Sequence, residues 1–439
     1  MLAPTILLFL STSAQALTIP LYNASGAEFS LRQRPVITGF RTYANGGQHG
    51  SIDAIPANPF GDASFPDAIF VETLEIGTPP RKINLQMDTG SWQLWTYDTD
   101  CTSDDSNIKF YVPSASDTSK QIEHSSWSAG YGNGAFMKNL SSIYTDTVKF
   151  GTVSLQNQAI GRPQEACSTA KGQVTQGLIG LGYGSWPNAH PPQNTFFTDL
   201  APTLKMPLFT VSLNYRNPGF YDFGFVDKRK YSGPLRYFPV PTLPTQSLWG
   251  VNATGYAVGD NQSLKPFDGG NLPTFIDSGG AFIFLPPKYC DEYYAQASFA
   301  EPANVDINHN GNPMATHIFP CSETLPDLVI AVGDYQTTIP GLLLQGSQYN
   351  ATSKCTHIAM QEDGRFFLLG GADFITSVRF ESDSQWRRVD TLIGGFVWSP
   401  LSSDHVRGVS ERAKRWTFGG SSAKAHSAVI RRRSEEQLI

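Results

Sequence analysis

The sequence lacks the short motifs that mark several classes of hydrolase. None of its eight histidines stands in an H-E-x-x-H pattern, and no G-x-S-x-G is present. The five cysteines contain no C-x-x-C pair, so they fit one or two structural disulfides with an odd thiol left over better than a metal site. These absences argue against a metal-dependent or serine hydrolase, and we expect the protein to need no metal or other cofactor.

Beyond the N-terminal residues the sequence has no long apolar run. No stretch there reaches the roughly 18 apolar residues that a membrane-spanning helix needs. A shorter stretch, Leu2–Leu10, precedes Ala14-Gln15-Ala16, which is typical of the cleavage site of a secretory signal peptide. We predict a signal peptide over residues 1–16. A buried strand is the alternative, because no Lys or Arg precedes the apolar stretch. We therefore expect no integral membrane segment, and a protein that is secreted or held in an acidic, vacuole-type compartment.

Asn-x-Ser/Thr triplets fit an exported glycoprotein, although such triplets also occur by chance. One lies at Asn23, and the four predicted glycosylation sites are Asn139, Asn252, Asn261 and Asn350.

Charge is scarce and unevenly distributed. Charged residues make up 16% of the chain, and the net charge is −6. Residues 402–439 hold eight Lys and Arg against four Asp and Glu, so the rest of the chain carries −10. The acidic body argues against a nucleic-acid partner. The basic end, 401–439, is interpreted as a disordered tail, with a polyanion-binding patch as the alternative.

Aromatic and turn-forming residues predict an all-β or β-rich fold with short helices. Short apolar stretches alternate with turn signals, and Ile83-Asn84-Leu85-Gln86-Met87 has strict period-two alternation. The same pattern of short strands and turns is predicted at 69–71, 142–150, 209–213, 275–285, 328–332 and 366–369, and residues 289–296 are predicted to be helical. Residues 17–66 are irregular, with Arg32, Arg34 and Arg41, and are interpreted as a propeptide or a flexible N-terminal arm.

A local repeat divides the rest of the chain. Asp88-Thr89-Gly90 and Asp277-Ser278-Gly279 each follow an apolar strand, and each is later followed by two apolar residues and a glycine, at 178–180 and 368–370. A single Asp-hydroxyl-Gly would be no more than a capped turn. The repeat predicts two related lobes, residues 67–216 and 217–400, joined near Asn217.

On these residues the sequence resembles the pepsin family of aspartic peptidases, from about Phe70 to Val389. Ile76-Gly77-Thr78-Pro79 and Asp88-Thr89-Gly90-Ser91 are similar to the first catalytic loop and the turn before it. Tyr131-Gly132-Asn133-Gly134 is similar to the hairpin flap, in which the tyrosine hydrogen-bonds the tryptophan that matches Trp95. The resemblance implies a bilobal double β-barrel with a cleft between the lobes, made as a zymogen.

The resemblance also implies roles for single residues. Asp88 and Asp277 would be the catalytic carboxyls. Thr89 and Ser278 would reach across to the opposite loop, and Ser91 would donate to Asp88. Cys321 and Cys355 match the disulfide of the second lobe. A pairing of Cys101 with Cys167, leaving Cys290 as a thiol, is a further guess.

Two adjacent carboxyls can hydrolyse a peptide bond without a metal or a covalent nucleophile. One deprotonates a water while the other protonates the scissile group, and their proximity makes them share a proton. Glycines 90 and 279 let the two loops face each other. The resemblance therefore implies an aspartic endopeptidase that acts in acid on peptides or proteins, and we expect a monomer.

Gly280 departs from the family, which has Ser or Thr there, so Asp277 lacks the hydroxyl that Ser91 provides for Asp88. The loss should raise the pKa of the pair and weaken its geometry unless a water fills the space. The departure keeps a second function open, namely a pepsin-fold protein that binds peptides or does other acid–base chemistry with little or no proteolysis. Aromatic side chains near the flap (Trp127, Tyr131, Phe136) and after the second loop (Phe282, Phe284) indicate apolar subsites, although core packing is the favoured interpretation of the phenylalanines.

Overall fold

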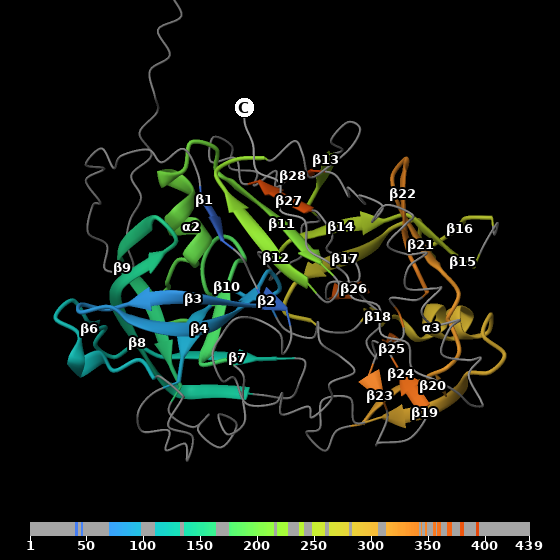
Figure 1. Ribbon diagram of the computed structural model, residues 1–439, viewed down its shortest axis with the longest axis horizontal. Helices are drawn as coiled ribbons and strands as arrows, with labels where there is room; N and C mark the ends of the chain where they lie inside the picture. Colours follow the sequence, from blue (N-terminus) through green and yellow to red (C-terminus); the bar gives the residue numbers. More distant parts are fainter. Residues whose placement is uncertain are drawn as a thin grey trace, which may run out of the picture. The chain divides into compact units, whose positions relative to one another are not determined.

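The protein is described from a computed structural model (Figure 1). The described residues are 40–42, 45–46, 70–97, 110–131, 136–163, 175–214, 217–226, 237–240, 248–259, 263–280, 283–305, 313–341, 344, 347–348, 354–356, 358–360, 367–370, 378–381 and 392–394. By its internal contacts the chain divides into residues 1–398 and 399–439, and all described residues belong to the first unit. Several predicted features lie outside the described residues: the signal peptide, Asn23, Cys101, Gly132, Gly134, Cys167, Asn261, Asn350 and the basic tail.

The N-terminal half is built on strands that close into a ring. Strand β3 pairs with β4, β4 with β10, β10 with β5, β5 with β9, β9 with β8, and β8 returns to β3. Alternation along β4 buries Ile83, Leu85 and Met87 completely in the core. The strands are β3 (Phe70–Ile76), β4 (Arg81–Asp88), β5 (Leu94–Thr96), β8 (Phe136–Phe150), β9 (Val153–Arg162) and β10 (Gly177–Gly180).

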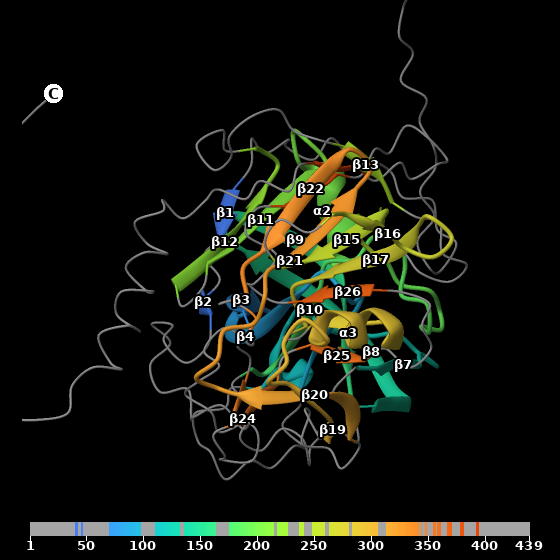
Figure 2. The same ribbon diagram turned by 90° about the vertical axis from the view of Figure 1, so that its right-hand side faces the viewer.

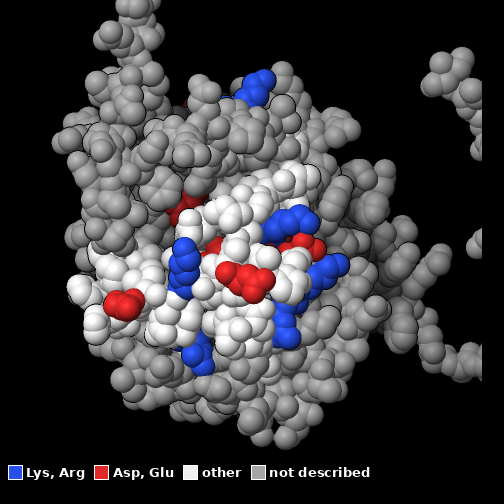
Figure 3. Space-filling view, turned by 90° about the vertical axis from the view of Figure 1, so that its left-hand side faces the viewer, with Lys and Arg blue, Asp and Glu red and all other residues white. Residues whose placement is uncertain are grey.

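Shorter elements border this ring. They are β2 (Asn45–Gly46), β6 (Lys120–Gln121), β7 (Trp127–Gly130), the 3₁₀ turns η2 (Pro113–Ala115) and η3 (Ala201–Thr203), and the helix α2 (Phe196–Leu200). On the face in Figure 3, basic and acidic side chains are interspersed over the described part of the surface. Between β8 and β3, Lys149 forms an ion pair with Glu75 at 2.8 Å.

The C-terminal half carries two sheets. The larger has the order β14-β17-β26-β18-β25-β20-β24-β23, with β19 also paired to β20, and the smaller is β16-β15-β21-β22. The larger comprises β14 (Gly250–Ala253), β17 (Leu272–Asp277), β18 (Ile283–Leu285), β19 (Glu301–Val305), β20 (Met314–Pro320), β23 (Ser347–Gln348), β24 (Lys354–Thr356), β25 (Ile358–Met360) and β26 (Phe367–Gly370). The smaller comprises β15 (Gly255–Val258), β16 (Lys265–Pro266), β21 (Leu328–Val332) and β22 (Tyr335–Ile339).

The same three-strand arrangement occurs in both halves and carries the sequence repeat. β10 runs parallel to β4, with Gly180 opposite Asp88, and β26 runs parallel to β17, with Gly370 opposite Asp277. β5 then pairs antiparallel with β10, and β18 with β26. In each half, the strand that contains the later apolar-apolar-glycine sequence therefore pairs with the strand that ends in the aspartate.

A six-stranded sheet has the order β1-β12-β11-β27-β28-β13. Its strands are β1 (Phe40–Thr42), β11 (Leu208–Asn214), β12 (Asn217–Phe223), β13 (Tyr237–Pro239), β27 (Val378–Glu381) and β28 (Leu392–Gly394). β1 pairs with β12, Phe40 opposite Phe223, and β2 pairs with β3. The prediction that residues 17–66 are irregular throughout is therefore wrong for these two short strands. Their backbone groups find partners at the exposed edges of existing sheets, which a search for local alternation does not detect.

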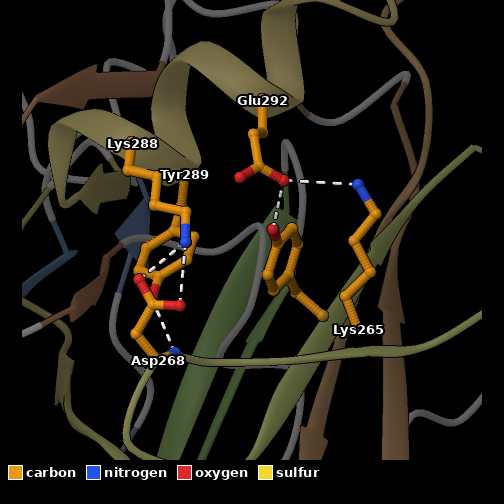
Figure 4. Close-up of polar contacts among 6 residues, drawn as sticks. Lys265, Asp268, Lys288, Tyr289 and Glu292 are labelled. Atoms are coloured by element: carbon orange, nitrogen blue, oxygen red, sulfur yellow. Dashed lines mark hydrogen bonds and ion pairs between the residues drawn. The ribbon is translucent and has the colours of Figure 1, made fainter.

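The predicted helix is confirmed as α3 (Pro287–Tyr294), which lies against β18 and β25. Figure 2 shows it beside β25. Polar contacts attach its outer face to the strands beside it (Figure 4). Lys288 pairs with Asp268 at 2.6 Å, while Glu292 accepts from the Tyr256 hydroxyl and lies 3.3 Å from Lys265. These ion pairs are exposed, so their contribution to stability is small.

Candidate active site

The two repeated loops lie face to face and exchange hydrogen bonds. The Thr89 backbone N–H donates to Ser278 Oγ at 3.1 Å, and the Ser278 backbone N–H donates to Thr89 Oγ1 at 2.9 Å. Each hydroxyl also donates to a backbone carbonyl of the opposite loop. The Thr89 hydroxyl donates to the Ile276 carbonyl at 2.8 Å, and the Ser278 hydroxyl donates to the Met87 carbonyl at 2.9 Å. All four groups are buried, so these bonds fix the two loops relative to each other.

The glycines bring the carboxyl groups together. A Cβ placed on Gly90 would lie 2.4 Å from the carboxyl carbon of Asp277, and a Cβ on Gly279 would lie 2.4 Å from that of Asp88. Real Cβ atoms do not approach other atoms so closely. Each loop therefore packs its bare Cα directly against the carboxyl group of the other loop, and any larger residue would force the pair apart.

Both carboxyls are held by their own loops in the same way. The Gly90 N–H donates to Asp88 Oδ1 at 2.7 Å, and the Gly279 N–H donates to Asp277 Oδ1 at 2.7 Å. Asp88 is buried, and burial raises the pKa of its carboxyl well above the ordinary range. The charge and the hydrogen bond of Asp277 raise this pKa further, while Ser91 and the Gly90 N–H lower it. Asp88 therefore favours its protonated form beside a second carboxyl.

Ser91 and Gly280 make the two loops unequal. Ser91 is buried next to Asp88, but within the described part of the chain its Oγ makes no hydrogen bond of ordinary geometry. The equivalent position in the second loop is Gly280, which has no side chain.

The predicted flap pair comes together. The Trp95 indole N–H donates to the Tyr131 hydroxyl at 2.7 Å, and the two ring centres are 6.2 Å apart. Tyr131 packs against an aromatic cluster that includes Trp95, Trp127 and Trp186. Burial and the nearby Asp88 both raise the pKa of Tyr131, so its hydroxyl stays neutral. The described flap ends at Tyr131, one residue before the predicted glycines.

Two polar residues near the dyad, Tyr221 and Glu72, were not predicted. Tyr221 of β12 is fully buried; burial raises its pKa, and the negative charges of Asp88, Asp277 and Glu72 contribute. Glu72 of β3 has its pKa raised to about 7 by burial. Its Oε2 and the Tyr221 hydroxyl make no hydrogen bond of ordinary geometry to the described residues. A Glu within an apolar strand was the available signal for this site, but it did not reveal what surrounds Glu72.

A third unpredicted contact joins the two halves at the dyad. The Gln86 side-chain amide donates from Nε2 to the carbonyl of Gly279 at 2.9 Å. A signal was available in the sequence, because the period-two alternation of residues 83–87 places Gln86 on the same face of the strand as Asp88.

The cysteines divide into two cases. Cys321 is disulfide-bonded and follows β20, in which Phe319 lies opposite Cys355 of β24. Cys290 of α3 is a buried thiol whose pKa is raised by burial. Of the predicted glycosylation sites, Asn252 lies half-buried in β14 and Asn139 lies in β8. Within the described residues no group of three or more His, Cys, Asp or Glu side chains could hold a metal ion, and no helix there is long and apolar enough to cross a membrane.

Comparisons with known proteins give one consistent result. The family model described as "Eukaryotic aspartyl protease" matches residues 69–391. Endothiapepsin from Cryphonectria parasitica is 32% identical over 295 residues, which cover 66% of this chain and 65% of endothiapepsin. Penicillopepsin-1 from Penicillium janthinellum is 33% identical over 306 residues, 69% of this chain and 88% of that protein. Podosporapepsin from Podospora anserina is 31% identical over 315 residues, 71% and 69% of the two chains. The matched part thus spans slightly less than two thirds of endothiapepsin.

Proposed function

This chain belongs to the eukaryotic aspartyl protease family, and we propose that it is an endopeptidase that hydrolyses peptide bonds in acid with Asp88 and Asp277 as its catalytic pair. The observation that carries the proposal is the packing of each loop glycine against the opposite carboxyl, 2.4 Å from a Cβ position to the carboxyl carbon. Two carboxyls held this close in a buried site share a proton, which is the state that the reaction needs.

The chemistry follows from that shared proton. In acid, one carboxyl is ionised and takes a proton from a water, while the other is protonated and donates to the scissile carbonyl as the water attacks. The Gly90 and Gly279 N–H groups, each 2.7 Å from a carboxylate oxygen, hold the acceptors in place. Activity should fall once Asp88, whose carboxyl favours its protonated form beside Asp277, loses its proton.

The substrate is proposed to be a peptide or protein that lies across the dyad beneath Tyr131. The hydrogen bond from Trp95 orients the Tyr131 hydroxyl. We therefore propose that Tyr131 closes over the scissile peptide bond. The aromatic cluster around this pair is buried, with Trp127 fully enclosed, so it supports the flap tyrosine from behind rather than lining a subsite.

Several properties of the mature protein belong to the same proposal. We propose a Cys321–Cys355 disulfide, supported by the pairing of β20 with β24. We also propose that residues 1–16 are removed on export and that a propeptide lies within 17–66. The two lobes would cover 67–216 and 217–400. The mature protein would be a glycosylated monomer that acts outside the cell or in an acidic compartment. Mass spectrometry of the secreted protein would give the first mature residue and the disulfide partners.

The decisive experiment is digestion of a denatured protein between pH 3 and pH 6. We expect cleavage by the wild type, inhibition by a statine-type transition-state mimic, and loss of cleavage in Asp88→Asn and Asp277→Asn. Asp117→Asn is the matched control, since Asp117 is an exposed aspartate of the same half. Cleavage that survives both dyad substitutions would refute the mechanism.

A second function is favoured by one observation, the absence of a side chain at Gly280 beside Asp277. In that case the protein would bind peptides at the same site with little or no hydrolysis. Binding of the statine-type mimic by a folded wild type that cleaves nothing at any acid pH would support this function instead.

A further inference from the structure

Gln86 is a neutral polar side chain placed beside the dyad. It lies in β4 two residues before Asp88, so its side chain leaves the strand on the same face as the catalytic carboxyl. Its neighbours across the sheet are apolar, Val71 on β3 and Leu178 on β10. Placing a half-buried amide between apolar neighbours costs free energy unless the amide forms a hydrogen bond.

The partner lies in the opposite half of the chain. Gln86 Nε2 donates to the Gly279 carbonyl at 2.9 Å. Gly279 is in contact with both carboxyls: its N–H binds Asp277 Oδ1 at 2.7 Å, and its Cα packs against Asp88. A hydrogen bond to this residue therefore acts at the point where the two halves of the dyad meet.

The second loop needs such a contact more than the first. Thr89 and Ser278 hold both loops equally, but Gly279 is followed by Gly280, so two residues without side chains come in succession. Glycine leaves the backbone the widest choice of conformations, and a loop with two of them needs an outside restraint to keep one conformation. Gln86, which is held in strand β4 of the N-terminal half, supplies such a restraint through its hydrogen bond to the Gly279 carbonyl.

We propose that Gln86 is a positioning residue that holds the Asp277 loop in register with Asp88 by its hydrogen bond to the Gly279 carbonyl. The inference rests on the proposed peptidase function. It gives Gln86 no contact with the reacting atoms, so its removal should lower turnover and leave substrate binding nearly unchanged.

The first test is Gln86→Met, which keeps the length of the side chain and removes the donor. We expect kcat to fall about tenfold at every pH, with KM within about twofold of the wild type.

The second test is Gln86→Glu, because a carboxyl group can donate only while it is protonated. An ordinary glutamate side chain has a pKa of about 4.5. At pH 3 the hydroxyl of the introduced carboxyl group replaces the amide donor, and kcat should lie within about threefold of the wild type. At pH 6 a carboxylate would face the Gly279 carbonyl, and kcat should fall at least as far as in Gln86→Met. Gln121→Glu, on the exposed strand β6, is the matched control and should keep the wild-type pH profile.

Urea unfolding of the same variants at pH 3 and pH 6 gives a readout that does not depend on activity. The stability of Gln86→Glu relative to the wild type should fall between pH 3 and pH 6, while that of Gln121→Glu should not. Wild-type turnover in Gln86→Met, or equal losses in Gln86→Glu at both pH values, would overturn the inference, as would a raised KM with unchanged kcat. An inactive wild type would refute only the proposed peptidase activity, and the unfolding data would still decide whether the contact matters.

Discussion

The carboxyl of Glu72, whose Oε2 is buried, should make the folded protein less stable as the pH rises from acid to neutral. Burial raises the pKa of Glu72 to about 7, against an ordinary value of 4.5. Below pH 4.5 the carboxyl is protonated in both the folded and the unfolded chain, so it contributes no pH dependence. Between these two pH values the unfolded chain releases the proton and the folded chain keeps it, so the free energy of unfolding falls as the pH rises.

The size of the loss follows from the same values. Each tenfold difference in proton affinity corresponds to about 1.4 kcal/mol, so ionising Glu72 in the folded protein costs about 3 kcal/mol, fully present above about pH 7. Glu72→Gln removes the ionisation. It should leave stability at pH 4 nearly unchanged and raise the free energy of unfolding at pH 7.5 by about 2 to 3 kcal/mol relative to the unsubstituted protein.

Urea unfolding at the two pH values measures this difference directly. Both proteins should carry Asp277→Asn, so that self-digestion does not contribute. Glu75→Gln on the same strand is the matched control: Glu75 is paired with Lys149, which lowers its pKa, so this substitution should not stabilise at neutral pH. The reasoning fails if Glu72→Gln changes stability by the same amount at pH 4 and at pH 7.5.

Three further predictions concern the site. Gly90→Ala places a methyl group 2.4 Å from the Asp277 carboxyl carbon. In a peptide-cleavage assay kcat/KM should fall at least about 100-fold, while circular dichroism should show a retained fold. Near-normal activity would contradict the dyad geometry. Tyr131→Phe removes the acceptor of the 2.7 Å bond from Trp95; kcat/KM should fall about tenfold, whereas Tyr144→Phe, away from the dyad, should have no effect. Gly280→Thr should raise kcat or shift the pH profile towards acid, and an unchanged profile would mean that a water or a neighbour already supplies that hydrogen bond.

Local patterns predicted much of the fold and the central pair. The strands at 328–332 and 366–369 were recognisable because their side chains are apolar, and β21 and β26 occupy nearly these positions. The two Asp-hydroxyl-Gly motifs predicted that Asp88 and Asp277 lie together, because the hydroxyl and the glycine of each loop make the same contacts with the other loop. The flap pair was predictable only through the resemblance, since a Tyr-Gly-Asn-Gly by itself predicts no more than a turn.

The unpredicted residues depend on contacts between distant segments. Gln86 and Gly279 are 193 residues apart in the chain; strand alternation places Gln86 on the face of Asp88 but does not identify Gly279 as its partner. Glu72 and Tyr221 come from different sheets, and the pKa of Glu72 is set by burial, which a sequence pattern does not measure. The strand β1 has partners only because β12 leaves an edge beside it.

The reciprocal hydroxyl bonds also determine when the two loops can come together during folding. They join residues that are 187 to 191 positions apart, so none of them can form while either half is unfolded. Contacts across such long loops form late, because the chain must lose the entropy of closure before the contacts stabilise it. Native strand content should therefore return earlier in refolding than binding of a statine-type inhibitor. Neither half on its own should cleave a peptide, however well it folds.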